Sequence, residues 1–130
     1  MQITSLGQLF IIGAGGFIGT IARVSMVGLV YRVLPLATFP YGTLAVNVLG
    51  CLAIGFLGGL AELHGGLNIP QQRFWIVGVL GGFTTYSAFA YETLGSIQAA
   101  DFDLFLLNVA GHLVFGLAAA WLGFTAAQYL

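Results

Sequence analysis

The chain of 130 residues has no lysine, and only 5% of its residues are charged, whereas soluble domains carry about 25% charged residues. A chain with so few charges cannot cover a water-facing surface, so we predict that it resides in a membrane. The net charge of −1 excludes a nucleic-acid binder, which needs a basic face. The lone Cys51 excludes a disulfide framework and a thiolate metal site.

Long apolar segments dominate what is present: 59% of the residues are hydrophobic, and the mean hydropathy is +1.02. A membrane helix needs about 20 consecutive apolar residues. Four segments meet this requirement, at about 6–33, 41–61, 74–97 and 104–130. We therefore predict an all-α membrane protein, a single four-span domain over residues 1–130 with both ends of the chain on the same side of the membrane.

The third of these segments contains the stretch GGFTTYSAF at residues 81–89. Glycine costs about 1 kcal/mol against alanine inside a helix, and threonine is stiff at χ1, so we expect a helix break here. Freed backbone carbonyls are tolerated in a bilayer only where protein or water surrounds them, and they can then hold a cation. Carbonyls near Gly81 and Thr84 are therefore candidate ligands of a hard monovalent cation such as Na⁺.

Side chains in the same stretch suggest an anion path. The hydroxyls of Thr85 and Ser87 can donate hydrogen bonds to an anion. Tyr86 and Phe89 offer ring edges that carry the positive part of the quadrupole, which suits a small anion that must not bind too tightly. Simple packing of these two rings is an equally open interpretation.

Charge near the span ends gives almost no orientation bias. Arg32 flanks one face of the membrane, and Arg73 flanks the other. Because cytoplasmic loops normally carry the excess of Lys and Arg, a tie favours insertion both ways up. The expectation is a dual-topology protein whose oppositely inserted copies pair about a two-fold axis in the membrane plane. A single orientation set by other features is the alternative.

Three polar residues inside or beside the spans are candidates because such groups are costly in a bilayer. Arg23 lies late in the first span and either reaches the interface or faces a vestibule that attracts anions. Asn47 either joins helices or lines a pore. Glu92 either carries protons, meets solvent near the end of the third span, or has a hydrogen-bonded structural role, and the last two interpretations are favoured over the first.

Asn108, His112 and Gly116 follow one another at intervals of four residues in the fourth span. Residues four apart share a helix face, so these form a stripe that suggests a track for water or an ion. A buried histidine with satisfied hydrogen bonds is the alternative. In the first span, Gly15 and Gly19 have the small-xxx-small spacing that lets helix backbones approach closely.

The glycines at 13–19 also look like a dinucleotide-binding turn. That motif needs a preceding strand, a soluble βαβ unit and an acid about 20 residues further on. No acid appears before Glu62, so the interpretation fails, and no catalytic constellation supports an enzyme.

Three features together resemble the Fluc (CrcB-type) fluoride channel family. They are Arg23 after the early glycines, the stretch GTLAVN at 42–47, and the stretch at 81–89 followed by Glu92. The resemblance implies an antiparallel, dual-topology homodimer in the cell membrane, with two parallel fluoride pathways. It implies passive export of fluoride from the cytoplasm, which lowers fluoride toxicity, and a structural Na⁺ at the dimer centre held by carbonyls of Gly81 and Thr84.

The resemblance also assigns roles to individual residues. Asn47 matches the pore asparagine, Tyr86 and Phe89 match the pore phenylalanines, and Arg23 matches the vestibule arginine. Asn108, His112 and Gly116 match the polar track. The chain departs from the family pattern at Tyr86, where phenylalanine is usual, at Ala88, where threonine is usual, and at His112 and Gly116, where small polar residues are common. A protonated His112 is expected to favour anion entry.

Two other classes of membrane protein compete with a channel. A small proton-coupled drug or cation exporter of dual topology relies on an acid deep in the first span, and this first span has none. A non-transporting subunit that only packs against a partner has no reason to free carbonyls inside a bilayer.

Overall fold

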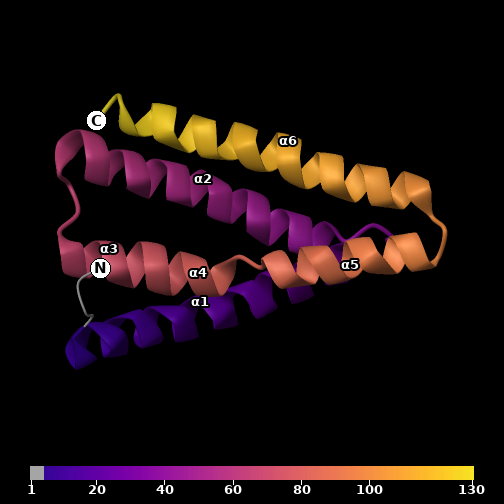
Figure 1. Cartoon of the computed structure of the whole chain (residues 1–130), viewed down its shortest axis with the longest axis horizontal. Helices are drawn as coiled ribbons and strands as arrows, with labels where there is room; N and C mark the ends of the chain where they lie inside the picture. Colours follow the sequence, from indigo (N-terminus) through magenta and orange to yellow (C-terminus); the bar gives the residue numbers. More distant parts are fainter. Residues whose placement is uncertain (1–4) are drawn as a thin grey trace.

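The computed structural model describes residues 5–130, which form helices and no strand. Four helical stretches are long and apolar enough to cross a membrane: α1 (Leu6–Val33), α2 (Tyr41–His64), a composite third span (Ile69–Gln98) and α6 (Phe102–Ala127). The first helix begins and the last helix ends at the same end of the bundle (Figure 1). The chain is therefore a multi-pass membrane protein, as predicted.

Capping residues set the ends of these helices, and they shift some boundaries from those predicted. Helix α2 ends at His64 rather than Ala61, because Gly65 adopts a left-handed φ of 58° and its N–H bonds to the carbonyl of Leu60. Asn68 caps the third span through a reciprocal pair of bonds with Gln71, so this span starts before the predicted position 74. Asp101 caps α6.

The third span is interrupted, as predicted, and consists of four helical pieces. They are α3 (Ile69–Gln72), a π-helical segment η1 (Arg73–Leu80), the short α4 (Gly81–Phe83) and α5 (Tyr86–Gln98). The glycines themselves remain helical. The break lies at Thr84 and Thr85, whose ψ angles of 159° and 107° are extended. The sequence pattern gave no indication of the π-helical segment.

Glycines bring the helix backbones into direct contact. Helix α2 packs mainly against α6, and α1 packs mainly against η1 and α4, so the interrupted span lies between α1 and the α2–α6 pair (Figure 1). A Cβ at Gly15 would lie 2.5 Å from the Phe74 carbonyl oxygen, and one at Gly78 would lie 2.7 Å from that of Ile12. The predicted close approach through Gly15 and Gly19 therefore occurs within one chain, against the third span.

Candidate functional site

The interruption is held open by the side chain of Asn47. The Thr85 N–H donates to Asn47 Oδ1 at 2.8 Å, and Asn47 Nδ2 donates to the Thr85 carbonyl at 3.1 Å. In a continuous α-helix the Thr85 N–H would instead donate to the carbonyl of Gly81. Asn47 therefore joins α2 to the third span and leaves the Gly81 carbonyl without its usual helical donor.

Arg23 reaches the same interruption from α1. Its Nη1 donates to the Thr84 carbonyl at 3.4 Å, and the guanidinium is half-buried. The hydroxyl of Thr84 donates back to the Leu80 carbonyl at 3.0 Å. A fixed positive charge therefore lies beside the break, inside the bundle.

Thr85 is also the N-cap of α5. Its Oγ1 accepts the N–H of Ala88 at 3.2 Å and lies 3.3 Å from the exposed hydroxyl of Ser87. This capping bond satisfies one of the free N–H groups of the first turn. The positive end of the α5 dipole consequently points into the break, where it favours negative charge.

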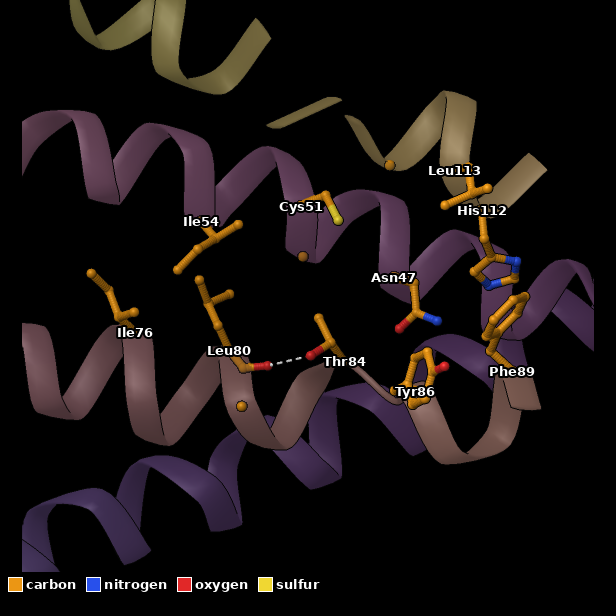
Figure 2. A pocket seen from close by; sticks show the side chains of 13 residues that line it. Asn47, Cys51, Ile54, Ile76, Leu80, Thr84, Tyr86, Phe89, His112 and Leu113 are labelled. Carbon is orange, nitrogen blue, oxygen red and sulfur yellow. Dashed lines mark hydrogen bonds between the residues drawn. The ribbon is translucent and has the colours of Figure 1, made fainter. Parts of the chain in front are cut away.

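A cavity of about 460 Å³ lies beside the break, between α2, the third span and α6 (Figure 2). Side chains and backbone from these elements line it: Asn47, Gly50, Cys51, Ile54, Ile76, Leu80, Gly81, Thr84, Tyr86, Phe89, His112, Leu113 and Gly116. Its aromatic end is a row of rings. The centroids of Tyr86 and Phe89 are 5.7 Å apart, and those of Phe89 and His112 are 4.3 Å apart.

Hydrogen bonds connect the polar stripe of α6 to α5. Asn108 is fully buried, and its Nδ2 donates to Thr93 Oγ1 at 3.0 Å. The Thr93 hydroxyl donates to the Phe89 carbonyl at 2.6 Å, and His112 Nδ1 lies 3.0 Å from the Asn108 carbonyl. The first residue of the stripe, Asn108, is therefore linked through Thr93 to the Phe89 backbone. Of the stripe, only His112 and Gly116 line the cavity.

Glu92 is bonded to α2 and does not line the cavity. One carboxylate oxygen accepts the Thr43 hydroxyl, and the other is buried without a partner among the described residues. Of the two favoured interpretations of Glu92, this arrangement matches the hydrogen-bonded structural role and not contact with solvent.

The structure brings most of the predicted site residues together. Seven of them line the cavity: Asn47, Gly81, Thr84, Tyr86, Phe89, His112 and Gly116. Thr85 and Ser87 lie at the adjoining start of α5, whereas Asn108 is buried behind Thr93, and Arg23 approaches from the α1 side.

The predictions missed two hydroxyl residues beside the site. Thr43 donates to Glu92, and Thr93 links Asn108 to the Phe89 carbonyl. Thr93 follows Phe89 by four residues, and Thr43 belongs to the 42–47 stretch. Both could have been found by examining every polar residue within the spans, because each such side chain needs a hydrogen-bond partner there.

Comparison with known proteins gives the same family as the residue pattern. Residues 10–124 match the family described as "CrcB-like protein, Camphor Resistance (CrcB)". A protein of Nitratidesulfovibrio vulgaris named "Fluoride-specific ion channel FluC" is 40% identical over 116 residues, which cover 89% of this chain and 93% of that protein. A protein of the same name from Elusimicrobium minutum is 42% identical over 129 residues, covering 98% and 99%. The resemblance drawn from the sequence is thus confirmed, and the chain belongs to the CrcB-like family.

Proposed function

We propose that this protein is a fluoride-selective, passive anion channel that lets fluoride leave the cytoplasm. The observation that carries the proposal is its likeness, over nearly the whole chain, to relatives named fluoride-specific ion channels. Neutral HF crosses membranes and dissociates inside a cell, where the anion accumulates. A selective leak for the anion reverses this accumulation and lowers fluoride toxicity.

The chemistry of the cavity suits a small anion. Positive electrostatic potential comes from Arg23 and from the first turn of α5, which both point into the break. The ring edges of Tyr86 and Phe89 are weak anion contacts, so an ion that enters can also leave. Asn47, whose amide is bonded to Thr85, lines the cavity and holds the adjoining helix break open.

The functional unit we propose is an antiparallel, dual-topology homodimer. Arg32 lies in the last turn of α1 and Arg73 at the start of η1, which are opposite ends of the bundle (Figure 1). This balance gives neither orientation an advantage. With Cys51→Ser as background, Gln128→Cys should be labelled by a membrane-impermeant thiol reagent in about half of the molecules in sealed vesicles. Labelling of all molecules or of none would show a single orientation.

We further propose a structural Na⁺ between the two copies, held by the carbonyls of Gly81 and Thr84. The Gly81 carbonyl fits this role because Asn47 has taken its usual helical donor. The Thr84 carbonyl accepts one long bond from Arg23 and retains a free lone pair. The thermal unfolding temperature of the purified protein should fall when N-methylglucamine replaces Na⁺. An unchanged unfolding temperature would count against the ion.

Ion efflux from liposomes tests the proposed function directly. A fluoride electrode should record rapid fluoride efflux from liposomes that contain the purified protein, with no chloride efflux and no need for a proton or substrate gradient. Fluoride efflux should persist in Glu92→Gln, because Glu92 does not line the cavity. Transport that requires a proton gradient and disappears in Glu92→Gln would establish the exporter instead.

A further inference from the structure

The donor and acceptor of each hydrogen bond between Asn108, Thr93 and the Phe89 carbonyl can be assigned. The one hydrogen of the Thr93 hydroxyl is donated to the Phe89 carbonyl at 2.6 Å, so Thr93 Oγ1 can only accept from Asn108. The amide of Asn108 therefore presents Nδ2 to Thr93, and its Oδ1 is left buried without a partner among the described residues.

The same reasoning assigns the tautomer of His112. The backbone carbonyl of Asn108 can only accept, so the Nδ1 atom of His112, 3.0 Å away, carries a hydrogen in every charge state. The atom of His112 that gains and loses a proton on titration is therefore Nε2. It is buried and has no hydrogen-bond partner among residues 5–130. In the neutral ring, Nε2 is an acceptor, and an acceptor disfavours an anion.

We propose that His112 is a proton-dependent determinant of anion binding in the cavity, an inference that rests on the proposed fluoride conduction. When Nε2 is protonated, the stripe gains a positive charge at the aromatic end of the cavity. The imidazolium lies against the ring of Phe89, with the ring centroids 4.3 Å apart, so its field acts on an anion at the edge of that ring (Figure 2).

Proton and anion then stabilise each other. A proton on Nε2 has no acceptor in the part of the chain that the structure describes, so the charge it creates is stabilised when a small hard anion enters the cavity. By linkage, the protonated ring must increase anion occupancy by the same factor. The unprotonated ring gives no such assistance.

Other titratable groups near His112 come from the two helices packed against α6, which are α2 and α5. Cys51 of α2 and Tyr86 of α5 line the cavity. Thiols and phenols as classes of side chain titrate above neutral pH. Among residues 5–130, Glu92 is the one acid on the membrane-spanning parts of α2 and α5 near the cavity, and it is bonded to Thr43. A pH effect near neutrality therefore has His112 or Glu92 as its source, and substitutions separate the two.

Fluoride currents in planar bilayers test the inference, because current counts ions and not neutral HF. Between about pH 8 and about pH 4.5, a range that extends below the ordinary titration of imidazole, the wild-type current should rise at least about threefold. The current through His112→Ser, which has a hydroxyl donor at every pH, should be flat. His64→Ser is the matched control: His64 lies at the far end of α2 against the Ala127 carbonyl, and this variant should keep the wild-type slope.

A wild-type current that does not change with pH would overturn the inference while leaving the channel intact. So would a slope that survives in His112→Ser or disappears in Glu92→Gln. Absence of fluoride current at every pH would refute the proposed function itself. In that case ¹⁵N NMR of the histidines in nanodiscs decides independently: fluoride should increase the fraction of His112 protonated on Nε2 and leave His64 unchanged. No response of His112 to fluoride would refute the inference.

Discussion

Asn47 of α2 and Thr85 of the third span exchange two hydrogen bonds, so that one side-chain amide takes the place of a backbone partner. The pair satisfies the N–H and carbonyl of a residue that lies between two helices and belongs to neither. In a bilayer those groups would otherwise face hydrocarbon, where an unsatisfied backbone group costs several kcal/mol. This pair explains how a span can be interrupted beside a cavity and still be stable.

Removal of this amide should destabilise the protein. We expect Asn47→Leu to lower the free energy of unfolding by about 1–3 kcal/mol, because two backbone groups of Thr85 lose their partner. Unfolding in SDS titrations of the detergent-solubilised protein measures the change. Leu49→Ala, on an exposed part of the same helix, is the control and should lower it by less than about 1 kcal/mol. Equal losses of unfolding free energy in the two variants would show that the hydrogen bonds between Asn47 and Thr85 do not stabilise the protein.

Close packing of α1 on the third span gives a second prediction with a matched control in the same helix. A Cβ at Gly19 would lie 2.9 Å from the Phe83 nitrogen and still closer to the Val79 carbonyl oxygen, whereas one at Gly13 would meet nothing within 4 Å. We expect Gly19→Ala to cost about 1–3 kcal/mol of stability, because backbone atoms must move apart. Gly13→Ala should be neutral or stabilise by up to about 1 kcal/mol. The SDS unfolding assay measures both variants. Equal changes in unfolding free energy for Gly19→Ala and Gly13→Ala would contradict the close packing at Gly19.

Aromatic edges in the cavity should decide the rate of fluoride efflux. Phe89→Leu keeps an apolar side chain but removes the ring edge, so we expect efflux to fall at least about tenfold. Tyr86→Phe keeps the edge and removes a hydroxyl that can hold the ion, so efflux should be equal or faster. Phe102→Leu, at the exposed start of α6, is the control and should not change the rate. A tenfold loss in Tyr86→Phe would instead show that the phenol is required.

The guanidinium beside the break should attract fluoride through its charge. We expect Arg23→Gln to lower fluoride efflux about two- to fivefold at low ionic strength, and less as added salt screens the charge. Liposome efflux at several concentrations of an impermeant salt measures this dependence. Arg32→Gln removes an equal charge from the exposed last turn of α1 and serves as the control. If the loss in Arg23→Gln does not depend on salt, Arg23 acts by holding the Thr84 carbonyl rather than by attracting the anion.

The membrane spans could be predicted from the sequence because hydropathy is a local property. Any window of about 20 residues either is or is not apolar enough to cross a bilayer, so the bounds of α1 were predicted without error. The interrupted third span was also predictable, because its cluster of glycine and hydroxyl residues departs from a good helix former. The motif at 81–89 was specific enough to indicate the family.

The tertiary structure decided where the break lies and which polar atoms remain free. The sequence predicted a break within residues 81–89 without giving its position; Gly81 and Gly82 stay helical, and Gly82 lies against the Gly16 backbone. The chain opens at Thr84 and Thr85 instead, because Asn47 claims the Thr85 N–H. Likewise, the contact of Asn108, predicted to belong to the ion track, with Thr93 of α5 was not apparent from the sequence. Hydrogen-bond partners such as Asn47 and Thr85 lie 38 residues apart in the chain, so only the packing of α2 on the third span determines which atoms meet.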